Sequence, residues 1–432
     1  MKISLLLSLF LVYTFTSFSQ KPLDAKTKNE IINSVSKILL NDYVYPDTAI
    51  LMSKHILKQL ADGKYKSVSS VVVLTNALNA DIKTAVNDGH FQITYNPVME
   101  KQLLNHGELA PTPIASGNYR NANAGIRSIK ILNGNIGLLE LGNFVDPTKE
   151  AKEAMRSALT FLANTNAIIF DLRNNGGGSP EMVQYICGYF FEKETHLMDW
   201  YNRPLNRTIE YYAWPDSTEK RFIHKPVYIL AGKGTASAAE EFCYDLKHLK
   251  RATLIGQATA GAAHGTLERT AGHGVIVYVP YAHVINAITK TDWEHTGVIP
   301  DINVAPEKAL EVAQEKIFET LLKTTTDTLN LFELNWQYDI LKAYNNPVTI
   351  DKETLQKFCG IYGERTFTLE NGELYYQRVG KPKFKLSAMT NNVMKGNDFF
   401  KIEFIKSADG SYNEIIAYYQ DRRIERATRT SK

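Results

Sequence analysis

Cysteine is scarce in this sequence, with only three residues among 432. An odd number of thiols cannot pair completely, and no Cys-x-x-Cys or Cys/His spacing typical of a metal site occurs. Cys187 and Cys243 lie inside apolar helical patterns, so we expect both to be small buried core residues. The cysteines therefore predict neither thiol chemistry nor a structural zinc site.

A strong charge of either sign is also absent. Lys and Arg number 49 against 46 Asp and Glu, and no basic run occurs that could follow a nucleic-acid backbone. We therefore expect no nucleic-acid partner. Apolar residues make up 44% of the chain, which is ordinary for a globular protein, and its length exceeds what one core usually supports. Two or three domains are expected.

One long apolar run occurs, at the N-terminus. Residues 3–15 are apolar apart from Ser and Thr, and they lie between Lys2 and the small residues Ser17 and Ser19. This order is typical of a cleaved signal peptide, and the run is too short for a convincing membrane span. No Cys follows it that could carry a lipid anchor. We predict a signal peptide at 1–20 and an exported protein, periplasmic or secreted, without stable membrane insertion.

Hydrophobic periodicity divides the remaining chain into four parts. Apolar residues recur at helical spacing over 21–105, which predicts an N-terminal helical domain. Short apolar strands alternate with amphipathic helices over 106–325, which predicts an α/β core with helices packed on a sheet. A polar passage at 326–349 is interpreted as a linker. Period-two runs over 350–432, including a pair around Asn-Gly, predict a small antiparallel β domain.

Two strand-to-helix transitions contain candidate catalytic residues. Residues 171–178, DLRNNGGG, end an apolar run with three glycines, which let backbone N–H groups approach a ligand. Residues 234–240, GTASAAE, begin a helix in which we expect Thr235 to be the N-cap and Ser237 to lie in the first turn. There the helix dipole and the N–H of Ala238 could stabilise negative charge developing after serine attack on a carbonyl. Taken alone, a tight turn and a capping serine explain these segments equally well.

Four ordered segments resemble peptidase family S41, the group of tail-specific, tricorn-core and retinoid-binding-protein-like members. Two are the transitions just described, and the others are 255–261, IGQATAG, and 297–301, GVIPD. The resemblance implies a crotonase-like α/β core with Ser237 as nucleophile. It also implies an oxyanion hole formed by the amides of Gly177 and Ala238.

The residue that activates the serine distinguishes two branches of this family. Tail-specific members carry a Lys directly after the glycine of the third motif, but here Ala262 follows Gly261, so a Ser-Lys dyad is not expected. The other branch uses a His from the segment before the core, and 88–91, DGHF, resembles that element. Imidazole suits this task because its pKa lies near operating pH. We predict His90 as the general base, with a solvated turn histidine as the alternative.

A histidine base is usually oriented by a further acceptor. Glu294, three residues before Gly297, matches the position of the tricorn-core glutamate, and Asp88 is the alternative. His264 lies in a run that resembles the Gly-Ala-His segment of retinoid-binding-protein-like members, which suggests a place on the substrate-pocket wall. His90 and His264 have no second ligand at helical or hairpin spacing, so we expect no metal. Two further residues are assigned to substrate binding: Gly176 and Gly178.

The sequence thus predicts a serine-type endopeptidase that hydrolyses peptides or unfolded proteins through an acyl-enzyme, without a metal or organic cofactor. About forty residues separate His90 from the first core strand, too few for the PDZ domain that many tail-specific members insert there. Selection of substrates by their C-terminus is therefore not carried over. Two alternatives stay open: a catalytically silent protein that binds apolar ligands on the same fold, and a non-peptide serine hydrolase such as an esterase. The sequence does not indicate the oligomeric state.

Overall fold

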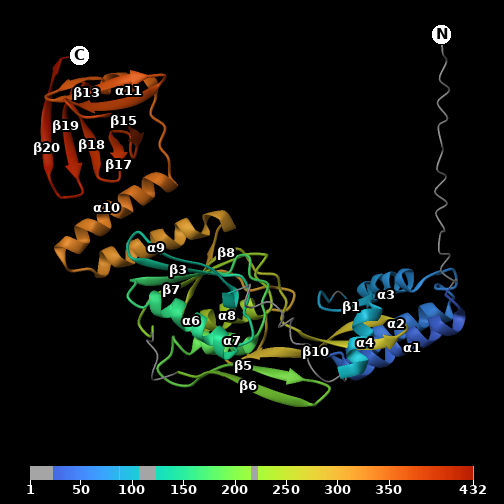
Figure 1. Cartoon of the computed structure of the whole chain (residues 1–432). Helices are drawn as coiled ribbons and strands as arrows, with labels where there is room; N and C mark the ends of the chain where they lie inside the picture. The colour runs from blue at the N-terminus through green and yellow to red at the C-terminus, as the bar shows by residue number, and fades with distance from the viewer. Residues whose placement is uncertain (1–22, 87, 107–122, 216–221, 432) are drawn as a thin grey trace, which may run out of the picture. The chain divides into compact units, whose positions relative to one another are not determined.

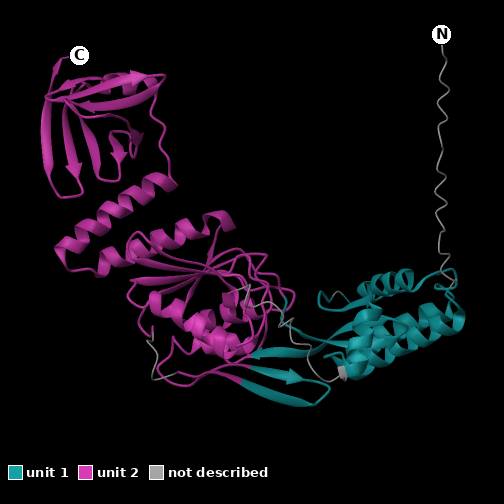
Figure 2. Ribbon diagram, in the orientation of Figure 1, with its two compact units in different colours: residues 1–115, 199–210, 262–285 teal, residues 116–198, 211–261, 286–432 magenta. Residues whose placement is uncertain are grey.

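The computed structural model describes residues 23–86, 88–106, 123–215 and 222–431 (Figure 1). The predicted signal peptide at 1–20 lies outside these residues. No helix in the described ranges is both long and apolar enough to cross a membrane. The chain divides into two compact units, and each is described by itself (Figure 2). The first unit comprises 1–115, 199–210 and 262–285, and the second comprises 116–198, 211–261 and 286–432.

This division differs from the domain boundaries expected from the sequence. Residues 199–210 and 262–285 were expected in the core but belong with the N-terminal helices, whereas 350–432 groups with the core. The reason is strand pairing, because 265–272 and 275–286 form strands that complete the first unit. Sequence order alone does not reveal such a return of the chain.

The first unit is built from helices packed on antiparallel strands. The helix α1 (Ala25–Asp42) begins after Asp24, whose carboxylate accepts a hydrogen bond from the Thr27 N–H at 2.7 Å. Its apolar residues at helical spacing are buried against strands β9 (Gly265–Gly272) and β10 (Val275–Asn286). The predicted helices are confirmed here. The other elements are α2 (Pro46–Ala61), α3 (Val71–Ala85), β1 (Gln92–Tyr95), α4 (Pro97–His106) and parts of β5 (Thr195–Asn202) and β6 (Arg207–Ala213).

Strand β10 brings two distant loops together. β1 and β9 both pair antiparallel with β10, and the sheet order is β1-β10-β5-β6 with β9 on β10. Both strands run antiparallel to β10, β1 starting opposite Tyr278 and β9 opposite Ala282, and the ring centroids of His90 and His264, which precede them, lie 5.8 Å apart. The loops that precede them, which contain His90 and His264, therefore lie at one edge of this unit.

The second unit contains a six-stranded sheet of order β11-β8-β7-β4-β3-β2. Only β2 runs antiparallel to its neighbour, and the other strands pair in parallel. The short apolar strands expected between 106 and 325 are confirmed here, and the near-continuous apolar character of 136–141, 167–171 and 227–231 reflects burial on both faces. The strands are β2 (Ile126–Leu132), β3 (Ile136–Leu141), β4 (Ala167–Asp171), β7 (Val227–Ala231), β8 (Thr253–Gly256) and β11 (Ile302–Asn303).

Helices cover both faces of this sheet, which gives the unit a mixed α/β architecture. On one face, Ile169 belongs to the apolar cluster formed with α9 (Ala309–Thr324). On the other face, the ring of Phe170 packs against that of Phe242 on α8 (Ala238–His248), with 5.1 Å between the ring centroids. Cys187 and Cys243 are fully buried, as expected, and burial raises the pKa of both thiols well above the usual value. The remaining helices are α6 (Lys149–Phe161) and α7 (Pro180–Cys187).

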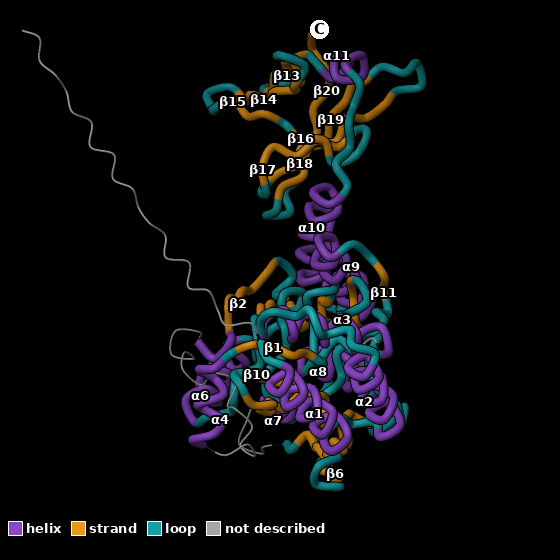
Figure 3. Tube along the Cα trace, turned by 90° about the vertical axis from the view of Figure 1, so that its right-hand side faces the viewer, coloured by secondary structure: helices purple, strands orange, loops and turns teal. Residues whose placement is uncertain are grey.

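The interval 326–349 is not a linker, because helix α10 (Thr328–Asn345) fills it. The Asp327 carboxylate caps the helix by accepting from the Asn330 N–H at 2.7 Å. α10 follows α9 and lies between it and the strands of the C-terminal region (Figure 1, Figure 3). Trp336 is buried and donates from Nε1 to the Asp398 carbonyl at 2.9 Å. Only two residues of α10, Leu334 and Trp336, are buried.

Residues beyond α10 form a nine-stranded antiparallel sheet with the order β15-β14-β13-β12-β20-β19-β18-β17-β16. Asn371 and Gly372 connect β13 to β14 with φ values of 53° and 83°, as a two-residue hairpin turn requires. The predicted hairpin is confirmed. The elements are α11 (Lys352–Phe358), β12 (Gly360–Tyr362), β13 (Arg365–Glu370), β14 (Glu373–Arg378), β15 (Lys383–Lys385), β16 (Ser387–Ala388), β17 (Val393–Asn397), β18 (Phe400–Lys406), β19 (Tyr412–Tyr419) and β20 (Ile424–Ser431).

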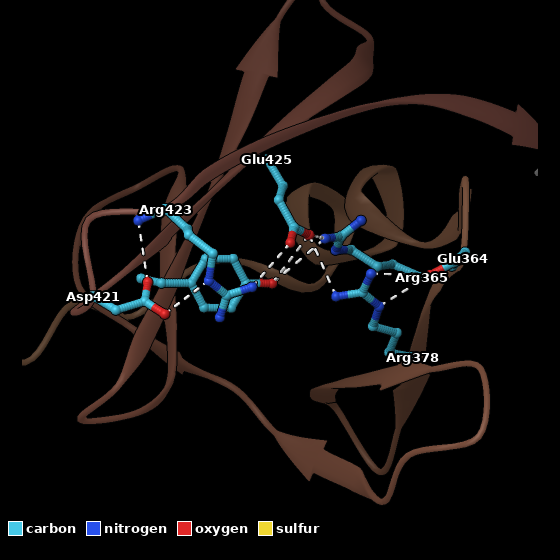
Figure 4. Close-up of polar contacts among 7 residues, drawn as sticks. Glu364, Arg365, Arg378, Asp421, Arg423 and Glu425 are labelled. Carbon is cyan, nitrogen blue, oxygen red and sulfur yellow. Dashed lines mark hydrogen bonds and ion pairs between the residues drawn. The ribbon is translucent and has the colours of Figure 1, made fainter.

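A cluster of arginines and carboxylates links strands of this sheet (Figure 4). The carboxylate of Glu425 on β20 accepts from Arg365 on β13 and lies 3.4 Å from Nη1 of Arg378 on β14. Arg423 donates to the other Glu425 oxygen at 3.3 Å. The Arg365 side chain is only 6% exposed, so the carboxylate of Glu425 compensates a buried positive charge.

Candidate active site

The two motif-bearing loops of the second unit leave neighbouring strands. β4 and β7 are parallel, with Asp171 opposite Leu230, so the glycine run and the loop that contains Ser237 leave the same edge of the sheet. The Ala236 N–H donates to the Asn175 carbonyl at 3.0 Å and joins the two loops. Binding sites of open α/β sheets lie at this edge, beyond the carboxyl ends of the strands.

Ser237 occupies the N-cap of α8, not the first turn. Its φ is 55° and its ψ is −125°, a conformation that non-glycine residues rarely adopt. The expectation that Thr235 caps the helix is wrong. The buried Thr235 hydroxyl donates to the Leu172 carbonyl at 2.7 Å and accepts from the Gly232 N–H at 3.1 Å, so it joins the strand ends. The Ala238 N–H is the first of the helix and has no carbonyl partner within it.

Glu240 holds the Ser237 backbone in place, a role that the sequence analysis missed. Its fully buried carboxylate accepts from the Ser237 N–H at 2.9 Å and from the Gly261 N–H at 2.7 Å. The Thr259 hydroxyl donates to the same carboxylate. The Ser-x-x-Glu spacing of 237–240 is the signature of a capping box and could have identified both the cap and this glutamate.

Only part of the triple-glycine run requires glycine. A Cβ on Gly177 would lie 2.7 Å from the Ser237 Cβ and 2.7 Å from the Ala236 carbonyl oxygen, and its φ is +105°. Gly178 has a φ of +135°, and a Cβ there would overlap the Phe144 carbonyl. A Cβ on Gly176 would have no atom within 4 Å. The backbone at Gly177 therefore packs directly against the serine.

The amide expected to share the oxyanion hole with Ala238 already has a partner. The Gly177 N–H donates to Asn175 Oδ1 at 2.9 Å. The Asn175 side chain is fully buried and donates through Nδ2 to the Leu141 carbonyl at 3.0 Å, which fixes its orientation. Gly177 could stabilise an oxyanion only by exchanging this hydrogen bond.

The third and fourth motifs are joined to each other by hydrogen bonds. The Val298 N–H donates to the Thr259 hydroxyl at 2.6 Å, and the His295 N–H donates to the Gly261 carbonyl at 3.0 Å. Because Glu240 also binds Thr259 and Gly261, both motifs are connected to the serine loop. Glu294 lies in this segment with a largely buried carboxylate, 3.6 Å from His295 Nδ1.

His90 and His264 belong to the first unit, where the carboxylate of Asp88 lies between them. Asp88 Oδ2 is 3.4 Å from His264 Nδ1, and Asp88 Oδ1 is 3.9 Å from His90 Nδ1. The side chains of Asp88 and His264 are 2% and 1% exposed, against 18% for His90. Of the two imidazoles, His90 is thus the more accessible to a substrate.

Asp88 is held in its charged form. Burial alone would raise its pKa, but the hydrogen bond and charge of His264 and the backbone N–H of His90 lower it to about 2. The Tyr43 hydroxyl contributes by donating to Asp88 Oδ2 at 2.9 Å. A permanently ionised acceptor beside two imidazoles can fix their tautomers by accepting a ring N–H.

A second buried acidic group lies on α8 itself. Asp245 is fully buried and accepts from Asn286 Nδ2 at 2.8 Å. Burial raises the pKa of Asp245 to about 7, with the Asn286 hydrogen bond acting in the opposite direction. Burial likewise raises the pKa of Glu241, and the charges of Asp245 and Glu181 add to this.

Two family models match the chain. Residues 135–304 match peptidase family S41, and residues 25–123 match the N-terminal domain of Peptidase_S41 in eukaryotic IRBP. Carboxyl-terminal-processing peptidase 2 from Arabidopsis thaliana is 32% identical over 177 residues, 38% of this chain and 31% of that protein. The carboxy-terminal processing protease CtpA of Bacillus subtilis is 29% identical over 175 residues, 39% of this chain and 34% of that protein. The chain therefore matches about a third of the length of each relative.

Two solved structures of peptidases show a partial similarity to the chain. A putative peptidase from Parabacteroides merdae is 18% identical with a TM-score of 0.48, covering 67% of this chain and 96% of that one. The tricorn protease is 14% identical with a TM-score of 0.42, covering 69% of this chain and 37% of that one. The two matched family models together span more than half of the 432 residues, and the four motifs all lie within the match to peptidase family S41 at 135–304. The chain belongs to peptidase family S41.

Proposed function

We propose that this protein is a serine peptidase that cleaves peptides or unfolded protein segments through an acyl-enzyme on Ser237. The observation that carries the proposal is the conformation of Ser237. Its positive φ is maintained by Glu240 and by the close approach of Gly177, at the positive end of α8. Strained backbone of this kind is common at active sites and is hard to explain by helix capping alone.

In the proposed reaction the Ser237 hydroxyl attacks the scissile carbonyl while His90 accepts the hydroxyl proton. The N–H of Ala238 stabilises the oxyanion, and Gly177 contributes if its amide leaves Asn175. Protonated His90 then donates to the leaving amine. Water then attacks the ester carbonyl while His90 accepts its proton, and His90 returns this proton to the Ser237 oxygen as the acyl–oxygen bond breaks and the acid leaves. Glu294 and Asp88 are the candidates to orient the base, with Gly176, Gly178 and His264 contacting substrate.

Two relatives support peptide bonds as the substrate class, since both are carboxyl-terminal processing proteases. We propose endopeptidase activity for this chain. We also propose that a signal peptide at 1–20 directs export to a periplasm or outside the cell. The core is proposed to have a crotonase-like fold.

The test combines a fluorophosphonate probe with cleavage of an unfolded protein. We expect the wild-type protein to be labelled and to cleave, the Ser237→Ala variant to do neither, and His90→Ala to lose at least about 100-fold in rate. Labelling without cleavage of peptide bonds would favour an esterase. Absence of both, with apolar ligands bound equally by wild type and Ser237→Ala, would contradict the proposal and favour a binding protein.

A further inference from the structure

We propose that Asp88, His90 and His264 form a binding site for Zn²⁺ in the first unit. One donor atom from each side chain lies within 4.8 Å of the donor atoms of the other two. Sequence spacing did not indicate this site, because Asp88 and His90 lie in one turn and His264 follows far along the chain. The pairing of β1 and β9 with β10 brings them together.

The donor types and distances suit zinc. Two imidazoles and one carboxylate are the kind of three-residue set found where zinc keeps an open position. Bonds of about 2.0–2.2 Å in a tetrahedral site set neighbouring donors roughly 3.4 Å apart. Asp88 Oδ2 already lies 3.4 Å from His264 Nδ1, and Asp88 Oδ1 lies 3.9 Å from His90 Nδ1. A small rotation of the more exposed His90 ring would complete the set.

The residues around these donors resemble the outer shell of a metal site. The Tyr43 hydroxyl donates to Asp88 Oδ2 at 2.9 Å. His264 Nε2 lies 3.3 Å from the Tyr45 hydroxyl, so the second nitrogen of this ring has a partner while Nδ1 faces the carboxylate. Metal-binding histidines nearly always engage their second nitrogen in this way, which fixes the ring orientation.

An ion can also reach these donors. A cavity of about 600 Å³ is lined by Asp88, Gly89 and His90 together with residues of α3, β1, β9 and β10. His90 is 18% exposed, whereas Asp88 and His264 lie deeper. Zinc would therefore enter past His90 and be retained by the two buried donors.

Zinc held at these three residues would occupy the imidazole that the proposed mechanism uses as its base. This consequence rests on the proposed function: an imidazole bound to zinc through one nitrogen and held in place cannot serve freely as a proton acceptor. Zinc would then act as a reversible inhibitor of the peptidase. The effect would require no other metal-dependent step.

The test is a titration of the chelator-treated protein with ZnCl₂ by calorimetry, and with Co²⁺ by visible absorption, which reports tetrahedral coordination. We expect one Zn²⁺ per chain in the wild type. Asp88→Asn and His264→Gln should each weaken binding at least about tenfold, and Tyr45→Phe should weaken it by about tenfold through its effect on the ring of His264. Circular dichroism melts check that each variant is folded.

The matched control is His273→Ala. His273 lies in the same unit and pairs with a carboxylate, Glu30 Oε2, at 2.8 Å, but it supplies only two donors in an exposed position. This variant should bind zinc as the wild type does. No binding by the wild type, or equal binding by folded Asp88→Asn and His264→Gln, would overturn the site.

Fluorophosphonate labelling separates the metal site from its regulatory role. Saturating Zn²⁺ should suppress labelling of the wild type, chelation should restore it, and Tyr45→Phe should need more zinc for the same effect. Unchanged labelling of a protein that binds zinc would refute the inhibition. Failure of the metal-free protein to label would instead refute the proposed function, while the calorimetric result would still decide the metal site.

Discussion

Replacing Gly177 by alanine should damage both the fold and the nucleophile. The added Cβ would lie 2.7 Å from the Ser237 Cβ, 2.7 Å from the Ala236 carbonyl oxygen and 3.0 Å from the Ala238 nitrogen. None of these atoms belongs to a flexible side-chain end, so the backbone must shift, at about 1–3 kcal/mol. The φ of +105° adds about 1–3 kcal/mol of strain for a non-glycine residue. We expect the free energy of unfolding to fall by about 2–5 kcal/mol.

The same substitution should slow acylation, since a displacement of about 1 Å at a reacting group can cost on the order of 100-fold. Gly232→Ala is the matched control, because a Cβ there would lie 3.5 Å from its nearest neighbour, Pro306 Cγ, which is an ordinary van der Waals contact, and its stability should change by less than about 1 kcal/mol. Urea unfolding followed by tryptophan fluorescence measures the first effect, and the rate of fluorophosphonate labelling measures the second. Equal midpoints and equal labelling rates for the two variants would refute the close approach of Gly177 to the serine.

Three further predictions follow from buried groups of the second unit. Glu240→Gln places an amide N–H₂ where the carboxylate accepts backbone hydrogen bonds. The free energy of unfolding should therefore fall by about 1–3 kcal/mol, and fluorophosphonate labelling of Ser237 should be slower. Wild-type values for both measurements would contradict the role of Glu240. Because burial raises the pKa of Asp245 to about 7, the folded protein holds a proton there that the unfolded chain loses near pH 4. The free energy of unfolding should therefore fall as pH rises from about 4 to about 7, and Asp245→Asn should flatten this dependence in urea titrations; an unchanged slope would argue against it. Glu425→Gln should destabilise the protein by somewhat less than the roughly 3–5 kcal/mol of a fully buried pair, because Glu425 is 28% exposed while Arg365 is 6% exposed; thermal melts with no shift would contradict this.

Elements with a strong local pattern could be predicted from the sequence. The near-continuous apolar runs of β4 and β7 predict strands that are buried on both faces between layers of helices, as observed. The hairpin around Asn371 followed from the need for two positive φ values in its turn. These features are determined by a few neighbouring residues, so the local sequence is sufficient to predict them.

Features that depend on residues far apart in the sequence could not be predicted from local patterns. Helix α10 has few buried residues, and Trp336 donates to the carbonyl of Asp398, which lies much later in the sequence, between β17 and β18. The neighbours of Asp88 were also hidden, because His264 reaches it only through the pairing of β9 with β10. The capping residue of α8 was different, since the Ser-x-x-Glu signal at Ser237 was present in the sequence and pointed to the observed structure.

Mass-spectrometric mapping of the fluorophosphonate adduct shows whether Ser237 is the nucleophile. We expect one modified peptide, with the added mass on Ser237, and no adduct in the folded Ser237→Ala variant. Slower modification of the same residue is expected in Gly177→Ala and normal modification in Gly232→Ala. An adduct on another residue, or equal modification of Ser237→Ala, would show that Ser237 is not the nucleophile.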